Sequence, residues 1–448
     1  MIVRHFVLSG TFRELEESFD VRYVFHEDST SSKKGIYLDW RALGLRDAVG
    51  FEIPRARYGL WHDMFSITAL RNQRGTGNFK HRLDLMATVN DPKNVRRYAR
   101  LSLPFVYPFV RWRHLRRLGA YAPLERFVRE EAPDIVIHPS ILTGYFINEL
   151  LQICPRLGIP IVLLMNSWDN PSTKATGTGT PDRLVVWGPQ TRDHAIRYMR
   201  MPPERVLEFG AAQFDVYREP LRANREELAR EFGVPADRPI LLYAGVSKSI
   251  NESAHLAALD AAIADGRVPR CHVIYRPHPW RGALIAGETD FRQLNLRHTT
   301  LDPHMAEFYA RAVGGEAIGF EPADYRVTVR LLTLCDGVIS PLSTILLEAA
   351  ICGKPGLAFL PSDVADLGEA QGQLWRNLPH FAEFWLPPLL RASFDSAELP
   401  AMASDLLAFA RDPATATALK RHAAKFVVLD GPRYGTRVAA LARELAAA

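Results

Sequence analysis

The chain has 448 residues, of which 47% are hydrophobic and 23% are charged, and its formal net charge is +5. This composition excludes a disordered chain, a collagen-like repeat and a small disulfide-stapled scaffold. A single core stops growing near roughly 250–300 residues, so a chain of this length is expected to form two domains. The small basic excess favours an anionic partner without identifying one.

The four cysteines lie among apolar residues and form neither a CxxC pair nor a metal-binding pattern with histidine. We expect them to be reduced core thiols. The first residues lack the charged and apolar regions of a signal peptide, and no uncharged apolar stretch reaches the roughly 18 residues of a membrane span. A cytoplasmic protein is therefore expected.

Short apolar runs alternate with amphipathic helical stretches, which is typical of βαβ units and parallel sheets. In the first half, strands are predicted at residues 22–25, 134–137, 160–164 and 183–187. In the second half, they are predicted at residues 239–244, 272–275, 337–339 and 356–360. Open α/β sheets bind ligands at the carboxyl ends of their strands, so the turns after these runs are the places to look for a site.

A basic and aromatic segment at residues 96–121 interrupts this alternation. Its arginines, interleaved with Tyr, Phe and Trp, are Arg96, Arg97, Arg100, Arg111, Arg113, Arg116 and Arg117. Cations suit the head groups of an anionic membrane and aromatic rings suit the boundary with its acyl chains, so the segment could hold the protein at a membrane surface. A buried helix pair with a solvated arginine face is an equally good interpretation, because Pro104 and Pro108 interrupt any continuous amphipathic helix.

The best domain boundary lies between the two sets of strands. Residues 214–220 precede a charged helical stretch at 222–232 and a turn rich in Gly and Pro at 233–239. We therefore expect an N-terminal domain over residues 1–212 and a C-terminal domain over residues 213–425. The end of the chain is rich in Ala, Leu and Arg at helical spacing, so residues 426–448 are predicted to cross back onto the first domain as a helix.

The motif Arg276-Pro277-His278-Pro279 follows the predicted strand at 272–275, and its prolines hold His278 in a rigid turn. A histidine fixed there can donate a hydrogen bond to a phosphate or a base. Gly245 and Ser247 follow the strand at 239–244 and bring a flexible glycine and a hydroxyl to the same expected edge. An isolated His-Pro is more often a plain turn, so this motif gains weight only together with the next one.

A second motif joins the strand at 337–339 to a predicted helix. Ser343 or Thr344 would cap that helix and, with the free backbone N–H groups behind it, offer an anion site for a phosphate. Glu348 lies one turn later on the same helical face, where it could accept hydrogen bonds from a ribose diol. Taken alone, a Ser-Thr pair before a helix is most often just an N-cap. The two motifs together in one α/β domain favour nucleotide binding.

These motifs, with the boundary at 210–215 and Asp430-Gly431-Pro432-Arg433 near the end, resemble the donor half of GT-B glycosyltransferases of bacterial surface polysaccharide synthesis. The likeness spans roughly residues 160–440 and is greatest to CDP-glycerol glycerophosphotransferases and bacterial sialyl- and Kdo-transferases. The resemblance implies two Rossmann-like domains facing across a cleft, with the donor on the second and the acceptor on the first. It also implies a CMP- or CDP-type donor, with UDP and GDP left open.

The resemblance is incomplete after the strand at 160–164. Glycerophosphotransferases carry Trp-His-Gly there, with the histidine as base, whereas this sequence has Trp168-Asp169-Asn170. Asp169 would take the proton from an acceptor hydroxyl, which moves the prediction from glycerol phosphate to a sugar donor. Lys174 would face the donor phosphates. The alternatives are that Asp169 caps the following turn and that Lys174 is solvated, and Asp39 and Asp63 are reserve candidates for the base.

The predicted reaction transfers a glycosyl group from a nucleotide-activated donor to a hydroxyl of a surface glycan or lipid-linked acceptor. Arg276, His278, Ser343 and Thr344 would neutralise the leaving phosphate, and no metal or other cofactor is expected. Two alternatives stay open: a GT-B-like sugar-nucleotide epimerase, and a non-catalytic membrane-associated binding protein of the same fold. Nucleic acid is not expected as a partner, because the arginines are gathered in one segment. That segment would place the protein at the inner face of the membrane.

Overall fold

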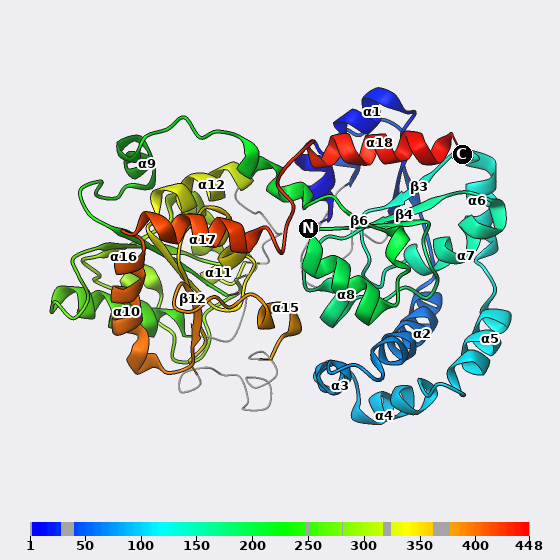
Figure 1. The fold of residues 1–448 in the computed structure, drawn as a ribbon, viewed down its shortest axis with the longest axis horizontal. Helices are drawn as coiled ribbons and strands as arrows, with labels where there is room; N and C mark the ends of the chain where they lie inside the picture. Colours follow the sequence, from blue (N-terminus) through cyan, green and yellow to red (C-terminus); the bar gives the residue numbers. More distant parts are fainter. Residues whose placement is uncertain are drawn as a thin grey trace.

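The computed structural model describes residues 2–27, 40–246, 251–279, 281–316, 324–361 and 377–447. Within these residues, two parallel sheets form the cores of two α/β halves, which lie on the right and the left of Figure 1. The fold class predicted from the sequence, an α/β chain with two Rossmann-like halves, is confirmed.

The first half contains a parallel sheet with the strand order β3-β4-β5-β6. Its strands are β3 (Val136–His138), β4 (Ile161–Leu164), β5 (Arg183–Val186) and β6 (Val206–Glu208). The helices α6 (Ala122–Glu131), α7 (Ile147–Leu157) and α8 (Pro189–Met199) accompany these strands, and a separate parallel pair is formed by β1 (Tyr23–His26) and β2 (Ala48–Phe51). β4 is buried along its whole length because a central strand of a parallel sheet is covered on both faces.

A layer of helices lies at one end of the first half, at the lower right of Figure 1. It consists of α2 (Arg55–Gln73), α3 (Phe79–Ala87), α4 (Pro92–Leu101) and α5 (Tyr107–Leu118). Their shared core includes Trp61, Met64 and Leu70 of α2. Pro108 lies in the first turn of α5, where a helix has no hydrogen bond for its missing N–H to make. A proline would break the interior of one long helix, and the basic and aromatic segment accordingly forms two separate helices, α4 and α5.

The second half contains a parallel sheet with the strand order β12-β11-β10-β7-β8-β9. Its strands are β7 (Ile240–Ala244), β8 (His272–Arg276), β9 (Thr299–Leu301), β10 (Gly337–Ser340), β11 (Gly356–Phe359) and β12 (Leu390–Ser393). Its helices are α9 (Arg225–Phe232), α10 (Glu252–Ala264), α11 (Ala306–Val313), α12 (Tyr325–Leu334), α13 (Ile345–Ile351), α15 (Pro379–Ala382), α16 (Leu399–Phe409) and α17 (Pro413–Ala423). From β7, the next strands along the chain, β8 and β9, are added on one side, whereas β10, β11 and β12 are added on the other side. The switch point of the sheet therefore lies between β7 and β10.

All eight strands predicted from the sequence are present. The strands that the sequence pattern missed are β2, β6, β9 and β12, and each borders its sheet. These edge strands are three or four residues long and partly exposed, so they carry no continuous apolar run. The edge strands β1 and β3 are predicted because each overlaps a run of three apolar residues, so the pattern reveals all of the central strands but only those edge strands that carry such a run.

The chain returns to the first half at its C-terminal end. The 3-10 segment η6 (Ala212–Arg218) leads from the first sheet towards the second, and α18 (Tyr434–Ala446) comes back to pack on α1 (Arg13–Ser18) (Figure 1). Tyr434 and Val438 of α18 share a buried cluster with Phe6 and Phe12. The predicted crossing helix is confirmed, and the domain boundary at residue 212 falls at the start of η6 and stays a prediction.

The cysteines are free thiols, and Cys154, Cys271 and Cys335 are buried, as predicted, whereas Cys352 is half-buried. Burial raises the pKa of Cys154, Cys271 and Cys352 to about 12. Burial also raises the pKa of Cys335. Among the described residues, none of the helices combines the length and the apolar sequence that a membrane span requires.

Gly435 lies where α18 meets α1, and a Cβ at this position would lie 2.5 Å from the backbone oxygen of Thr11. Gly435→Ala is therefore expected to displace α18 and to lower the free energy of unfolding by about 1–3 kcal/mol. Gly59→Ala in α2 is the control, because nothing lies within 4 Å of its added Cβ. It should be neutral or stabilise by up to about 1 kcal/mol. Denaturant unfolding measures both, and equal stabilities would contradict this packing of α18.

Candidate active site

The carboxyl ends of β7, β8 and β10 meet at one edge of the second sheet, because these strands are parallel neighbours. The N–H of Gly245 donates to the carbonyl of Arg276 at 2.9 Å, so the ends of β7 and β8 are joined directly. β10 ends at Ser340, just before the segment that carries Ser343 and Thr344. The structure thus brings these predicted residues to the switch point, where open α/β sheets bind ligands. Ser247 lies outside the described residues.

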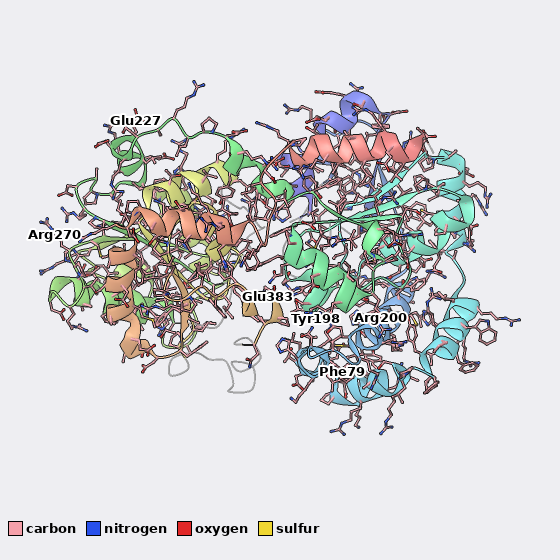
Figure 2. All side chains as sticks on the ribbon, viewed as in Figure 1. Phe79, Tyr198, Arg200, Glu227, Arg270 and Glu383 are labelled. Atoms are coloured by element: carbon pink, nitrogen blue, oxygen red, sulfur yellow. The ribbon has the colours of Figure 1, made fainter. Side chains whose placement is uncertain are left out.

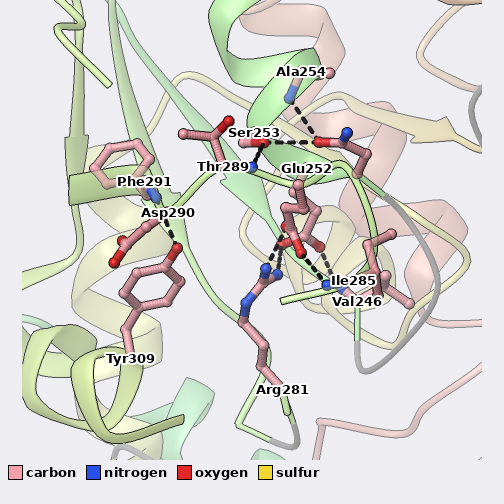
Figure 3. Close-up of polar contacts among 12 residues, drawn as sticks. Val246, Glu252, Ser253, Ala254, Arg281, Ile285, Thr289, Asp290, Phe291 and Tyr309 are labelled. Carbon is pink, nitrogen blue, oxygen red and sulfur yellow. Dashed lines mark hydrogen bonds and ion pairs between the residues drawn. The ribbon is translucent and has the colours of Figure 1, made fainter. Parts of the chain in front are cut away.

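A buried carboxylate beside Gly245 positions the loops after β7 and β8. Glu252, the first residue of α10, accepts the N–H of Val246 at 2.5 Å and the hydroxyl of Tyr275 at 2.5 Å. Arg281 forms an ion pair with the same carboxylate at 2.7 Å, as Figure 3 shows. A Cβ on Gly245 would lie 2.7 Å from the carboxylate oxygens of Glu252, so a larger residue would disturb this network. Gly245 is therefore needed for close packing.

Arg276 is held at the end of β8 by two side chains of the second half. Its guanidinium is 11% exposed, pairs with Asp302 at 3.5 Å, and donates to the hydroxyl of Thr328 at 3.2 Å. Burial raises the pKa of Asp302, although the charge of Arg276 opposes this. Asp302 and Thr328 therefore orient Arg276 at the ligand-binding edge.

Glu348 lies on α13 four residues after Thr344, as the sequence predicts. The hydroxyl of Tyr217 in η6 donates to its Oε2 at 2.5 Å. Burial raises the pKa of Glu348, while the charges of Arg276 and Arg4 partly offset this. Arg4 comes from η1 (Arg4–Leu8) in the first half, and its guanidinium lies 3.9 Å from the ring centre of Tyr325. Glu348 is thus influenced by arginines from both halves.

His278 is half-buried, and its carbonyl accepts the N–H of Arg281 at 2.8 Å. Burial lowers the pKa of His278 to about 4, so the imidazole is uncharged near neutral pH. An uncharged imidazole keeps one N–H that can donate to a ligand. This histidine therefore adds no positive charge near neutral pH, and its role as a donor to a ligand stays a prediction.

The predicted side-chain cap of α13 is wrong. Thr344 occupies the N-cap position, but its backbone is already helical, with φ −60° and ψ −23°. A capping side chain reaches back to the first turn from an extended backbone, so this geometry leaves the hydroxyl of Thr344 without that contact. Ser343 and Thr344 are half-buried, and their hydroxyls make no hydrogen bond within the described part of the chain. Both hydroxyls are therefore available to a ligand.

Asp169 belongs to a second cluster, at the end of β4 in the first half. It precedes η4 (Asn170–Lys174), forms an ion pair with Lys174, and accepts from the amide of Asn170 at 3.0 Å. Its side chain is 12% exposed, whereas that of Lys174 is 59% exposed. Asp169 holds the N-cap position of η4 without a side-chain capping bond, so the capping alternative is wrong. Within the described residues, Asp169 contacts neither Arg276 nor Glu348.

Trp168 fixes this second cluster against the other half of the protein. Its indole is 2% exposed, and its ring centre lies 5.1 Å from that of His380 in α15. The other ring neighbours, at 5.0 to 5.7 Å, are Phe381, Phe384 and Phe426. Burial lowers the pKa of His380 to about 3, so His380 is uncharged near neutral pH. Burial also acts to raise the pKa of Asp169, but the charge and hydrogen bond of Lys174 outweigh it, and this pKa lies below its usual value.

The sequence did not reveal several residues of the two clusters. Arg4, Tyr217 and His380 come from distant segments, and nothing in their local sequence marks them as partners of Glu348 or Asp169. Of the reserve candidates for a base, Asp39 lies outside the described residues. Asp63 accepts hydrogen bonds from Arg97 at 2.9 Å and from Tyr98 at 2.5 Å within the helical layer. Across the described residues, His, Cys, Asp and Glu side chains form no group of three suited to a metal ion.

No protein-family model matches the chain, and no curated protein sequence matches it significantly. Solved structures are similar in fold. The wall teichoic acid polymerase TagF is 13% identical over 70% of this chain and 89% of its own, with a TM-score of 0.38. The UDP-GlcNAc 2-epimerase of Neisseria meningitidis, bound to UDP-GlcNAc, is 11% identical over 72% and 80%, with a TM-score of 0.42. A glycosyltransferase of Rickettsia africae is 9% identical over 77% and 82%, with a TM-score of 0.39.

Asp169→Asn removes a largely buried carboxylate from its ion pair with Lys174, whereas Asp84→Asn removes an exposed carboxylate from its pair with Lys80. The folded pKa of Asp169 is lowered, so its stabilisation is present above the unfolded pKa of about 3.9 and is lost as the pH falls through the folded pKa. At pH 7, Asp169→Asn should cost about 1–3 kcal/mol of unfolding free energy. Asp84→Asn should cost no more than about 0.5 kcal/mol.

Urea unfolding between pH 8 and acid conditions measures this pair of variants. The deficit of Asp169→Asn should shrink once the pH falls below about 4. A deficit that stays constant over the whole pH range would show that the ionised carboxylate is not the source of the stability.

Proposed function

We propose that the chain is a GT-B-type glycosyltransferase that moves a sugar from a nucleotide-activated donor to a hydroxyl acceptor. The observation that carries this proposal is the arrangement at the switch point of the second sheet. An oriented arginine, Arg276, a carboxylate, Glu348, and the hydroxyls of Ser343 and Thr344, which have no hydrogen-bond partner among the described residues, lie at one edge there. These are the groups that a nucleoside diphosphate or monophosphate needs at its phosphate and ribose.

Each of these residues has a chemical role in the proposal. Arg276 and the hydroxyls of Ser343 and Thr344 neutralise the charge that develops on the leaving phosphate, which lowers the barrier to breaking the glycosidic bond. Glu348 accepts hydrogen bonds from the ribose diol. The helix α13 is only seven residues long. The proposal therefore assigns the phosphate contacts to these side chains and not to the free backbone N–H groups at the start of the helix. Protein cations take the place of a divalent metal, and the preference for CMP or CDP over UDP follows from the motif resemblance.

Asp169 is the proposed general base. Its lowered pKa keeps it ionised near neutral pH, and only the ionised form can accept a proton from an attacking hydroxyl. Its position beside α15 of the second half supports a role next to a donor bound there. Removal of this carboxylate is therefore expected to reduce turnover more than donor affinity.

Nucleotide titration in excess EDTA tests the donor site. Calorimetry with CMP, CDP, UDP and GDP should find at least one nucleotide that binds, and Arg276→Ala should weaken that binding by roughly 10- to 100-fold. Arg270→Ala makes the same charge change on the outer side of the second half, where Figure 2 labels Arg270, and should leave the affinity unchanged.

The outcomes of this experiment separate the three functions. No binding of any nucleotide, or equal effects of the two variants, would overturn the donor site. Binding that disappears in EDTA would refute metal independence alone. The third outcome is read with a labelled sugar derivative of the nucleotide that binds. If this nucleotide sugar is isomerised without an acceptor, the protein is an epimerase. If the nucleotide sugar binds but is never converted, the protein is a binding protein of this fold.

We further infer that α4 and α5 dock on an anionic lipid bilayer. None of the twelve residues of α5, all of them described, is buried, and Phe105, Phe109 and Trp112 are 97%, 60% and 53% exposed. Phe109 and Trp112 lie three residues apart on α5, and Phe105 lies in the turn just before it. The segment 92–118 contains seven arginines, one lysine and no acidic residue. Exposed rings with a cationic border match the acyl boundary and the head groups of an anionic membrane. Arg111 of α5 donates a hydrogen bond to the carbonyl of Thr178 at 3.2 Å, which connects this face to the loop after Asp169.

Vesicle sedimentation tests the docking face. The protein should bind phosphatidylcholine vesicles that contain phosphatidylglycerol, and much less those that do not. The triple change Arg100→Gln, Arg113→Gln and Arg117→Gln should weaken binding by about 100-fold, at roughly fivefold for each arginine. The pair Phe105→Ser and Trp112→Ser should weaken it through the loss of apolar contact.

The control is a second triple change, Arg230→Gln, Arg270→Gln and Arg411→Gln, which removes the same charge from exposed positions of the second half. It should leave vesicle binding unchanged. If both triple variants lose binding equally, the attraction is a property of the net charge and the docking face is refuted. Tighter binding to an RNA oligonucleotide than to the vesicles would also refute it.

A further inference from the structure

Arg82 of α3 is a buried cation without an ion-pair partner among the described residues. It is 4% exposed, and its Nε and one of its terminal nitrogens are fully buried and make no hydrogen bond there. Burial lowers the pKa of Arg82 to about 10 and the nearby Asp169 raises it, so the guanidinium is charged at neutral pH. A buried charge left unpaired is costly and is found where something else compensates it.

Other buried polar atoms around η4 also lack partners within the described chain. The unsatisfied atoms are Asn78 Oδ1, Asn166 Oδ1, Gln190 Oε1, His194 Nδ1 and His380 Nδ1. The helices α3, α8 and α15, which carry or border most of these residues, all pack against η4. The amide of Asn78 donates to the carbonyl of Ser172 in η4 at 2.8 Å, and that of Gln190 donates to the carbonyl of His380 at 3.0 Å. Folded proteins leave few such atoms unsatisfied, so a group of them indicates a site that a polar ligand or water completes.

The charges around η4 do not cancel. Asp169 already pairs with Lys174, and the electrostatic partner of Arg82 is the same carboxylate. Two cations therefore share one anion, because His380 and His194, with pKa values of about 3 and about 4, are uncharged near neutral pH. Another carboxylate at the cluster, that of Glu383, lies 3.9 Å from His194 Nε2 but is 55% exposed, so the buried part of the cluster has an excess of positive charge. A guanidinium with free N–H groups is suited to a planar or tetrahedral oxyanion.

We propose that Arg82 and Lys174 bind a phosphate group of the acceptor, next to Asp169. The amide oxygens of Asn78, Asn166 and Gln190 then accept hydrogen bonds from hydroxyls of the same ligand, and the imidazoles of His194 and His380 can donate to its oxygens. The assignment to the acceptor rests on the proposed function, whereas the binding of a phosphate does not. An acceptor held in this way presents a hydroxyl near the phosphate to the carboxylate of Asp169.

Thermal unfolding of the full chain with inorganic phosphate as the probe tests the site. Phosphate should raise the melting temperature of the wild type by about 2–4 °C relative to potassium chloride of equal ionic strength. Arg82→Met should itself melt higher than the wild type, because it removes an uncompensated buried charge, and should show no response to phosphate. Lys80→Met, an exposed cation on the same helix, should respond like the wild type.

Several outcomes overturn the proposal. A lower melting temperature of Arg82→Met with an undiminished phosphate response would make Arg82 a structural residue. If Arg82→Met does not fold, Lys174→Gln replaces it, because Lys174 is 59% exposed, and its phosphate response should fall by at least half. A phosphate response that disappears in Arg276→Ala while Arg82→Met retains it would place the phosphate in the donor site.

The nucleotide titration is independent of this test. If no nucleotide binds, the proposed donor site is refuted, but phosphate binding at Arg82 is not.

Discussion

The packing of Trp168 fixes the relation between the two halves at the candidate active site. The indole comes from the end of β4, and the rings around it, His380, Phe381, Phe384 and Phe426, come from the far end of the chain. Because Asp169 is the next residue, its carboxylate is held at this junction whatever the rest of the first half does. The buried aromatic cluster therefore serves two purposes, since it joins the halves and sets the position of the proposed base.

Two buried ionisable side chains, Glu252 and Arg82, differ in how many hydrogen-bond partners they have among the described residues. Glu252 has donors from Val246, Tyr275 and Arg281, as expected of a group whose task is to hold loops in place. Arg82 has no such partners among the described residues. Satisfied networks rigidify a fold, whereas unsatisfied ones mark places where stability is given up for binding.

The central strands and the strand-end motifs could be predicted because both follow from local sequence. A strand covered on both faces needs a continuous apolar run, and Arg276, Ser343 and Glu348 each follow such a run in one parallel sheet. The edge strands β2, β6, β9 and β12 could not be predicted, because they carry no continuous apolar run, whereas the edge strands β1 and β3 do carry one and are predicted. The partners Arg4 and His380 could not be predicted either, since only the folded chain brings them to Glu348 and Asp169. The error at Thr344 has a local cause: residue preference suggested a cap, but the backbone conformation excludes it.

The state of the thiols has a practical consequence for following how the two halves move. Thiolates, not thiols, react with maleimides, and the raised pKa values of all four cysteines keep them protonated, with three of them also out of reach of solvent. A cysteine introduced on the surface of each half would thus be modified ahead of the native ones. Fluorescence energy transfer between two such probes could then report domain movement in a chain whose own cysteines are left in place.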